Sequence, residues 1–433
     1  MEIKITKWAP EVTSSAVTAF LKRPAFDPVA EHSARGVLED IRLNGDVAVL
    51  KYIKDFDGVD VKLSDLRVTM AELAEAREIV DPQFRIAARE TYKRVTTFSR
   101  AGMKKDWKIF SPKGGELGEQ FVPFDRVGVY IPGGQAPLVS TVFMTVTLAK
   151  VAGVQQIVAC TPSDSHGKVN PHILFALEMA GATEIYRVGG IQAIGMMAYG
   201  TKSVGKVQKI VGPGGAYVTA AKKLVYGDVA LDLVAGPSEI AILADETAPA
   251  ECVAADLLSQ AEHGTGLEKA LLVTNSGALA ARVADQLMTQ SETLSRKQAI
   301  QRVLERGTLL VVVNTLDDGM ELCNQFAPEH LEIMVREPRN WLRKVRAAGA
   351  VFFGTWTPES AGDFVAGPSH VLPTGGTATM FSGLTVDDFR RRTSFMAFTR
   401  ADLQETLPVI EAFARVEGLD AHARAARMRF EVS

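Results

Sequence analysis

Gln260 and His263 stand three residues apart, and this spacing is the first sign of chemistry in the sequence. Thr247 and Pro249 are typical of a helix start, so a helix is predicted from about Glu251 onward to the histidine. Residues three apart share a helix face, so the amide and the imidazole could bind one metal ion. A histidine at a helix end is more often a structural hydrogen-bonding group, however, and an amide is an unusual zinc ligand.

Three further polar groups follow downstream. Glu329 and His330 precede a predicted strand, and strand ends in α/β sheets carry catalytic groups; both side chains can move protons near neutral pH. Asp363 lies in a predicted glycine-flanked turn, which could bring its carboxylate to a ligand. His422 follows Asp420, a predicted N-cap, and the first turn of a helix favours the neutral imidazole that a metal needs. Taken alone, each group also fits a plain role in a turn or on the surface. Brought together, they would form a metal site beside acid–base groups.

Composition indicates a globular enzyme. The chain has 433 residues, 47% of them hydrophobic and 23% charged, which is enough for two or three domains. A net charge of −3 and the lack of basic blocks argue against nucleic acid or acidic lipid as partners and favour a small-molecule substrate. Three scattered cysteines predict neither disulfides nor a cysteine zinc site, and the N-terminus has no signal-type apolar core. We therefore expect a cytoplasmic protein without membrane insertion.

The order of apolar patterns predicts an α/β fold. Helical spacing dominates the first hundred residues, and short β-branched runs alternating with helical segments then follow, as in parallel sheets. The strands fall into two groups around Gly236. The prediction is two Rossmann-like parallel-sheet domains with an N-terminal helical region and a C-terminal helical tail. The predicted boundaries are 1–125 for the mostly helical region, 126–235 and 236–381 for the two α/β domains, and 382–433 for the tail.

Two glycine-rich loops could contact phosphate. Gly212-Pro213-Gly214-Gly215 follows a predicted strand and opens a predicted helix, so its backbone N–H groups could receive an anion. It lacks the third glycine of the dinucleotide fingerprint, as does Ile131-Pro132-Gly133-Gly134. These loops suggest a nucleotide without establishing one.

Several motifs occur together and in a fixed order. They are Tyr130-Ile131-Pro132-Gly133-Gly134, Gly190-Ile191-Gln192-Ala193-Ile194, Gly212-Pro213-Gly214, Ala235-Gly236-Pro237-Ser238-Glu239, Asp256 to His263, Ala327-Pro328-Glu329-His330, Trp356 to Asp363, His370-Val371-Leu372-Pro373-Thr374 and Glu417-Gly418-Leu419-Asp420-Ala421-His422. From about Arg126 to the C-terminus this set resembles the histidinol dehydrogenase family.

The resemblance implies a zinc- and NAD-dependent oxidation of L-histidinol to L-histidine, through the aldehyde, in two hydride transfers. It implies one Zn²⁺ per subunit, an acid–base pair that handles the alcohol proton and the water, and a homodimer whose C-terminal tail is exchanged so that active sites are shared. By matching motifs, the implied zinc ligands are Gln260, His263, Asp363 and His422. The implied acid–base pair is Glu329 and His330, further substrate contacts are Ser238 and Glu417, and cofactor contacts are Tyr130, Gln192 and the Gly215 position. The zinc ligands and His330 would also contact the substrate.

The sequence departs from the family pattern in four places. Gln135 to Ser140 replaces the usual Lys-Ala-x-Tyr-Pro-Ser, and Gly215 replaces an asparagine expected at NAD. Phe364 replaces a tyrosine after the proposed ligand Asp363, and Gly367 to His370 replaces Gly-Thr-Asn-His. These changes affect the predicted cofactor contacts and substrate identity and leave the implied metal ligands and acid–base pair in place.

Three hypotheses follow. The first is histidinol dehydrogenase activity in histidine biosynthesis. The second keeps the same machinery for another polar primary alcohol, as in related sulfopropanediol dehydrogenases, and is motivated by the altered loop. The third is a non-catalytic zinc- or nucleotide-binding relative, which the presence of both Glu329 and His330 disfavours.

Overall fold

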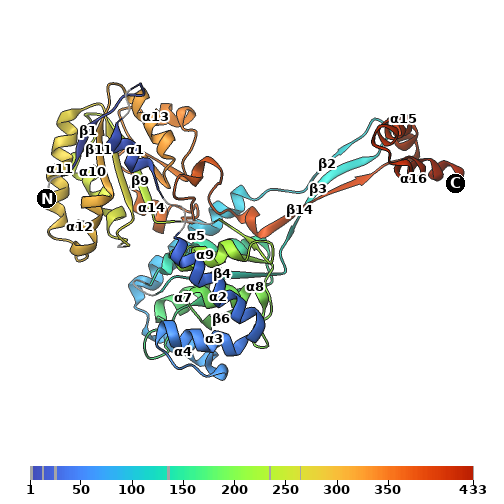
Figure 1. The fold of residues 1–433 in the computed structure, drawn as a ribbon, viewed down its shortest axis with the longest axis horizontal. Helices are drawn as coiled ribbons and strands as arrows, with labels where there is room; N and C mark the ends of the chain where they lie inside the picture. Colours follow the sequence, from blue (N-terminus) through green and yellow to red (C-terminus); the bar gives the residue numbers. More distant parts are fainter. Residues whose placement is uncertain are drawn as a thin grey trace. The chain divides into compact units, whose positions relative to one another are not determined.

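The computed structural model describes residues 3–11, 14–23, 27–133, 137–233, 236–263 and 265–432. They form two compact units (Figure 1). The first comprises Met1–Gly102 and Phe124–Phe389, and the second comprises Met103–Pro123 and Arg390–Ser433. The predicted α/β class with parallel sheets is confirmed. The four-part division of the sequence stays a prediction.

A six-stranded parallel sheet holds most of the candidate site residues. In spatial order its strands are β1 (Ile5–Lys7), β11 (Thr308–Val312), β10 (Lys269–Thr274), β9 (Glu239–Ala244), β12 (His330–Met334) and β13 (Ala350–Phe353). Every residue of β9 and β12 is buried, as expected for strands covered on both faces. One face packs on α10 (Ala250–Ala261), α11 (Gly277–Ser291) and α12 (Lys297–Arg306), and the other packs on α1 (Ser15–Leu21) and α13 (Leu316–Phe326).

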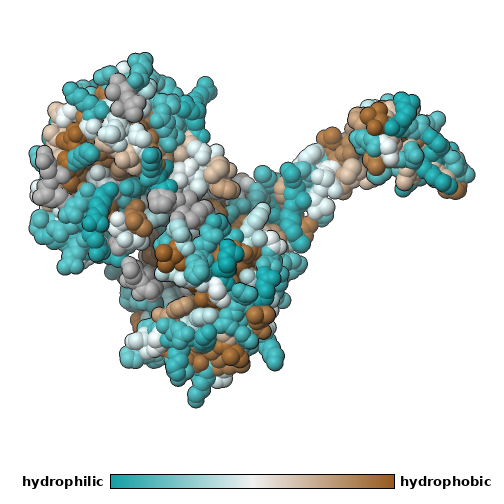
Figure 2. All heavy atoms as spheres, in the orientation of Figure 1, coloured by the Kyte–Doolittle hydropathy of each residue, from teal (hydrophilic) through white to brown (hydrophobic). Residues whose placement is uncertain are grey.

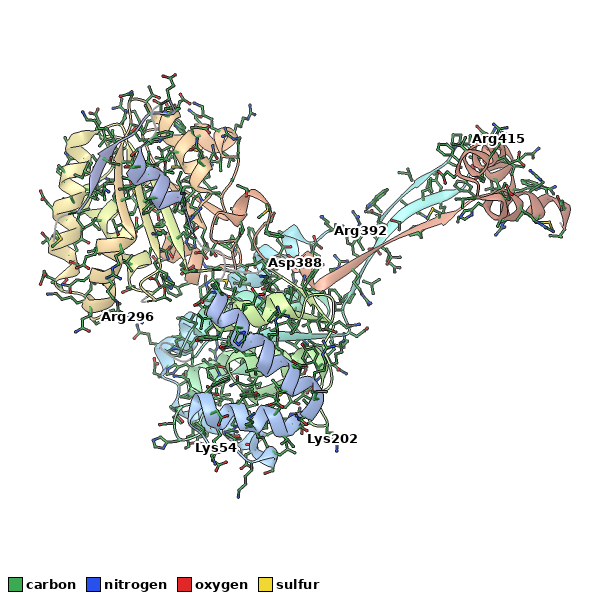
Figure 3. The ribbon with its side chains drawn as sticks, viewed as in Figure 1. Lys54, Lys202, Arg296, Asp388, Arg392 and Arg415 are labelled. Carbon is green, nitrogen blue, oxygen red and sulfur yellow. The ribbon has the colours of Figure 1, made fainter. Side chains whose placement is uncertain are left out.

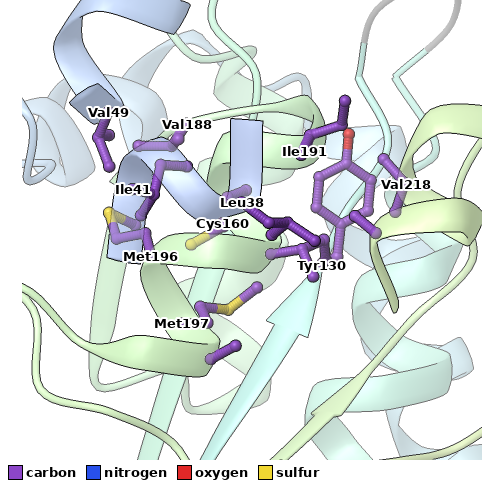
Figure 4. Packing of buried hydrophobic residues seen from close by; sticks show 14 of the residues in the cluster. Leu38, Ile41, Val49, Tyr130, Cys160, Val188, Ile191, Met196, Met197 and Val218 are labelled. Carbon is purple, nitrogen blue, oxygen red and sulfur yellow. The ribbon is translucent and has the colours of Figure 1, made fainter. Parts of the chain in front are cut away.

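The second parallel sheet of the first unit has five strands. In spatial order they are β6 (Glu184–Arg187), β5 (Gln156–Thr161), β4 (Arg126–Tyr130), β7 (Lys209–Val211) and β8 (Ala230–Leu231). Helices α2 (Pro28–Asn44), α3 (Asp46–Tyr52), α8 (Gly190–Tyr199) and α9 (Ala216–Leu224) pack on one face. Figure 4 shows this core, where Leu38 and Ile41 of α2 meet Met196 and Met197 of α8. The chain reverses its order in the sheet between β4 and β7, and ligands of such sheets bind at that reversal.

The remaining helices of the first unit complete these layers. They are α4 (Met70–Ile79), α5 (Pro82–Gly102), α6 (Val139–Ala152), α7 (Pro171–Ala180) and α14 (Glu359–Phe364). Short helical turns are a π turn at Ile53–Asp57 and 3-10 turns at Leu63–Asp65, Pro338–Lys344, Thr377–Thr379 and Val386–Phe389. None of the helices in the described ranges is both long and apolar enough to span a bilayer.

The second unit contains a three-stranded antiparallel sheet and two helices. Its elements are β2 (Trp107–Phe110), β3 (Glu116–Pro123), β14 (Arg390–Ala397), α15 (Arg400–Glu417) and α16 (Asp420–Glu431). Figure 3 labels Arg392 on β14 and Arg415 on α15. The predicted helical tail is confirmed in α15 and α16, whereas the strand β14 before them was not predicted.

Three local predictions need correction. The predicted helix from Glu251 ends at Ala261, so His263 lies just beyond it. Asp363 lies on the short helix α14 and not in a glycine turn. The helix has Pro358 as its N-cap and Val365 as its C-cap. Asp420 is the first residue of α16, whose N-cap is Leu419, although His422 does fall in the first turn as predicted.

Candidate active site

Gln260 lies in the last turn of α10 and is completely buried. Its Oε1 lies 3.1 Å from Nδ1 of His330, which begins the neighbouring strand β12. Its Nε2 has no hydrogen-bond partner among the described residues. A buried polar group without a partner is uncommon, so this amide is available to contact a ligand. The structure therefore joins two of the predicted site residues that are 70 positions apart.

The hydrogen bonds of His330 determine which ring nitrogen can act as a base. Nδ1 lies 3.2 Å from the backbone oxygen of Glu239. A carbonyl oxygen only accepts hydrogen bonds, so Nδ1 must carry the proton and the lone pair is on Nε2. Burial lowers the pKa of His330, while the nearby Asp363 opposes that shift. The imidazole is thus held neutral and able to accept a proton at Nε2, 3.9 Å from Oδ1 of Asp363.

Glu329 is a buried carboxyl held at the start of the same strand. Its Oε2 accepts the backbone N–H of Glu239 at 3.1 Å, and the hydroxyl of Ser238 hydrogen-bonds to it. Burial raises the pKa of Glu329 well above its usual value, and the negative charges of Asp363 and Glu239 raise it further. A carboxyl with a raised pKa can exchange a proton near neutral pH, as acid–base catalysis requires.

A residue with a strained backbone precedes Glu329 and His330. Ala327 has φ 46°, the one non-glycine residue with positive φ in the described parts of the chain. It is the C-cap of α13, so the chain leaves the helix sharply and enters β12 through Pro328. Left-handed strain of this kind in a residue other than glycine clusters at functional sites.

Asp363 and His370 lie next to each other beside the His330 imidazole. Nδ1 of His370 lies 3.6 Å from Oδ1 of Asp363, and its Nε2 lies 3.3 Å from Oγ1 of Thr141. Burial raises the pKa of Asp363, but the hydrogen bond from His370 and the electrostatic interaction with that imidazole outweigh burial and lower it to about 2. Asp363 is therefore a carboxylate, the form that binds metal. His370 was not among the predicted site residues, and only its place in a recognised motif could have indicated it.

His263, Glu359 and Asp363 form a cluster that could hold a metal ion. Each offers one ligand atom, and these atoms lie within 4.8 Å of one another. Imidazole nitrogen and carboxylate oxygen are zinc donors, so the donor set fits zinc. Glu359 was not among the predicted site residues. Its Oε2 accepts the hydroxyl of Ser259 at 2.6 Å, and burial raises its pKa to about 7.

A chain of buried carboxyls extends from this cluster. The backbone N–H of Glu359 donates to Oε1 of Glu332 at 2.8 Å, and the carboxyls of Glu332 and Asp256 hydrogen-bond to each other. Burial raises the pKa of Asp256 to about 6 and that of Glu332 well above its usual value. Glu332 was visible in the sequence as an acid within the apolar strand Leu331 to Met334. Because an unpartnered charge is costly in a buried strand, its position could have indicated a partner or a ligand.

The predicted cofactor contacts lie at the carboxyl edge of the five-stranded sheet. Tyr130 ends β4 and packs between Ile191 and Val218 (Figure 4). Its hydroxyl accepts the backbone N–H of Gly190 at 3.2 Å, and burial raises its pKa to about 12. Gln192 is buried with Oε1 unpartnered among the described residues, and its Nε2 donates to Asp57.

Gly215, Phe364 and Ser369 are positions at which the sequence departs from the family pattern, and all three lie in the described part of the chain. Gly215 is the N-cap of α9 and makes no side-chain cap. Phe364 is 56% exposed, so its ring does not fill the buried cluster. Ser369 is buried and donates from Oγ to the backbone oxygen of Met144 at 2.8 Å, which anchors the segment that carries His370. Gly134 and Gln135 lie outside the described residues.

Glu417 and His422 belong to the second unit. Glu417 ends α15, and the backbone N–H of His422 donates to Leu419 in the first turn of α16. Both side chains are exposed. Ser238, by contrast, lies beside Glu329 in the first unit, as described above.

The fold and the site define an α/β enzyme with a buried histidine and a buried carboxyl beside a group of metal-type ligands. The family model described as histidinol dehydrogenase matches residues 22–430. The chain is 45% identical over 395 residues to histidinol dehydrogenase of Heliobacterium mobile, covering 91% of this chain and 92% of that one. It is 43% identical over 405 residues to histidinol dehydrogenase of Bacillus anthracis, covering 94% of each chain. The crystal structure of histidinol dehydrogenase from Elizabethkingia anophelis superposes with a TM-score of 0.94 at 35% identity, covering 99% of this chain and 98% of that one.

The chain therefore belongs to the histidinol dehydrogenase family. It is an NAD-dependent oxidoreductase of amino-acid biosynthesis, and its substrate is a small molecule.

Proposed function

We propose that this protein oxidises L-histidinol to L-histidine through the aldehyde, with two NAD per substrate, in histidine biosynthesis. The observation that supports it most directly is the buried His330, whose free lone pair on Nε2 lies 3.9 Å from the proposed metal ligand Asp363. The family match over nearly the whole chain supports the same substrate. The three cysteines are free thiols, which fits a reducing cytoplasm.

Four side chains are proposed to hold one zinc ion per subunit: Gln260, His263, Asp363 and His422. A bound zinc would anchor the imidazole and amino groups of the substrate. The carboxylate state of Asp363 and the neighbouring Glu359 supply negative charge for a divalent cation. Glu359, a member of the cluster with His263 and Asp363, is placed to compete for a position at the metal or to accept a hydrogen bond from the substrate amine.

His330 and Glu329 divide the proton transfers between the two oxidations. His330 removes the hydroxyl proton of the substrate at Nε2, since Nδ1 already carries the proton that it donates to the Glu239 carbonyl. Glu329 takes a proton from the water that adds to the aldehyde, and its raised pKa makes it a stronger base once it is ionised. Ser238 keeps the Glu329 carboxyl in place through its hydroxyl and would contact the substrate.

The NAD contacts are proposed at Tyr130, Gln192 and Gly215. The amide oxygen of Gln192 is buried without a partner among the described residues, so a donor on the cofactor could satisfy it. At Gly215 only the backbone is available, because the residue has no side chain. NAD, when bound, accepts the hydride at each oxidation step.

We propose a homodimer in which the second unit supplies Glu417 and His422 to the active site of the other subunit. Large apolar side chains are exposed throughout this unit, and Figure 2 shows apolar atoms on its visible face. Trp107, Ile109, Phe110, Met396, Phe413 and Val416 are each 48% exposed or more. Apolar surface of this extent marks a protein interface. Light scattering of the purified chain tests the dimer, and mixing His422→Ala with Glu329→Gln subunits should restore activity to part of the hybrid dimers.

The alternative substrate, a sulfopropanediol or another polar primary alcohol, is not favoured. Two histidinol dehydrogenases, from Heliobacterium mobile and Bacillus anthracis, each match more than nine-tenths of the chain. Phe364, another of the positions that depart from the family pattern, exposes more than half of its surface.

The decisive experiment counts NADH formed per histidinol consumed by the zinc-loaded protein. We expect two NADH and one histidine per histidinol. Full zinc occupancy without turnover of histidinol would refute the proposed substrate, and the same assay with a sulfopropanediol would then test the alternative. The variant His330→Gln is the matched control, because it keeps a similar volume while removing the proposed base.

A further inference from the structure

The buried ion pair Lys222–Asp232 hydrogen-bonds to Gly212, the first residue of the loop Gly212 to Gly215. Nζ of Lys222 lies 2.5 Å from Oδ1 of Asp232, and their side chains are only 3% and 1% exposed. Nζ also donates to the backbone oxygen of Gly212 at 2.8 Å. The other carboxylate oxygen of Asp232 accepts the backbone N–H of Gly212 at 2.8 Å. Both polar backbone atoms of Gly212 are therefore held by one pair of charges.

Gly212 needs this support because its backbone is unusual. Its φ is +116°, and a β-carbon there would lie 2.2 Å from the backbone oxygen of Tyr130. The loop thus passes directly against the end of β4, where only glycine fits. Further along, Oγ1 of Thr219 donates to the backbone oxygen of Gly214 at 3.1 Å. Side chains of α9 and of the segment after β8 therefore fix the loop from outside it.

Neither charge has a part in the chemistry proposed above. A buried ion pair is costly to desolvate and is a weak source of stability, so its retention needs a reason. A comparable pair, Arg126 with Glu184, lies at the opposite end of the same sheet, where β4 and β6 begin. That pair joins two strand starts and touches no loop at the carboxyl edge, whereas Lys222 and Asp232 hold the loop that ends at the proposed cofactor contact Gly215.

We propose that Lys222 and Asp232 are positioning residues for NAD. They fix Gly212, and through it the backbone donors of the loop up to Gly215, in the geometry that receives the cofactor. This inference rests on the proposed use of the loop by NAD. It matters more in this chain than it would with a side chain at position 215, because the glycine can offer only correctly placed backbone groups.

The test compares two double variants of the zinc-loaded protein. Lys222→Met/Asp232→Asn removes both charges with little change in volume, and Arg126→Met/Glu184→Gln does the same at the other end of the sheet. NAD dissociation constants are measured by calorimetry without histidinol, and KM values for NAD and for histidinol are measured separately. For the first variant we expect the NAD dissociation constant and KM to rise about tenfold, which corresponds to the loss of one well-placed hydrogen-bonding group. The KM for histidinol and the zinc content should stay within about twofold of the wild type, far below that tenfold step.

The control variant should lose thermal stability without a change in NAD affinity. Equal NAD affinity of both double variants would overturn the proposal, because a purely structural pair lowers the melting temperature alone. If Lys222→Met/Asp232→Asn does not fold, the single variant Lys222→Gln replaces it. It removes the ammonium that donates to the Gly212 oxygen and leaves a neutral amide beside Asp232. Unchanged NAD affinity there would also overturn the proposal. Wild-type protein that binds NAD but does not oxidise histidinol would refute the substrate and leave this inference standing. Wild-type protein that binds no NAD would overturn both.

Discussion

Glu359 should make the metal-free protein less stable as the pH rises. Its side chain is buried, and burial raises its pKa from a usual 4.5 to about 7, with the negative charges of Asp363 and Asp256 adding to the shift. The folded state therefore binds this proton more tightly than the unfolded state does. The stabilisation is fully present below pH 4.5 and is lost as the pH rises through about 7. For a shift of this size the change between pH 5 and pH 7 is about 2 kcal/mol.

The variant Glu359→Gln isolates this contribution. Glutamine has nearly the same volume, and its amide oxygen can still accept the Ser259 hydroxyl that now donates to the carboxyl at 2.6 Å. The backbone N–H of residue 359 keeps its bond to Glu332. The variant lacks only the titrating proton, so the difference in unfolding free energy between wild type and variant should itself depend on pH.

The assay is urea unfolding of both proteins with a chelator at pH 5, 6 and 7. The wild type should lose about 2 kcal/mol relative to the variant between pH 5 and pH 7. Restoring zinc should oppose this loss, because a cation binds the ionised carboxyls of the cluster. Parallel stability curves for the two metal-free proteins would refute the raised pKa and the buried electrostatics on which it rests.

Three further predictions test the site and the loop. Glu329→Gln should retain zinc and slow the second oxidation about 100- to 10,000-fold, so that single-turnover experiments yield one NADH and the aldehyde; a full yield of histidine at the normal rate would contradict its role. His263→Ala should lose zinc and activity together, as measured by metal analysis and NADH formation, and full zinc occupancy would remove the residue from the ligand set. Gly212→Ala should lower the free energy of unfolding by about 1–3 kcal/mol, because its β-carbon would lie 2.2 Å from the Tyr130 oxygen, and an unchanged melting temperature would contradict that contact.

The parallel sheets could be predicted because their strands are buried on both faces. Runs such as Glu239–Ala244 and Gln156–Thr161 are almost continuously apolar, and that pattern is hard to satisfy in any other element. The strands of the second unit could not be predicted in the same way. Arg390–Ala397 begins with three arginines and is mostly exposed, so neither hydrophobic alternation nor burial marked it as a strand.

Residues with reactive or metal-binding side chains, such as His330, were predicted as part of the site. Acids that gain a role only because they are buried, such as Glu359, were missed. His330 and Gln260 were found through motifs, but their contact depends on β12 lying beside β9 and α10 packing over that sheet, which are tertiary facts. Asp363 was assigned to a turn because glycine precedes it. Its six-residue helix is too short to be stable from local propensity and depends on the surrounding fold.

Glu359 shows why the rest of the site was not visible in the sequence. It follows a proline at a helix start, where an acid is ordinarily explained by the helix dipole alone. In the structure Glu359 is itself one of the three groups of the metal-type cluster, next to the buried acids Glu332 and Asp256. Several buried carboxyls so close together are costly when ionised, and a cation or shared protons can offset that cost. The burial of Glu359, Glu332 and Asp363 so close together is therefore an argument for a cation at the cluster, and residue spacing in the sequence could not have supplied it.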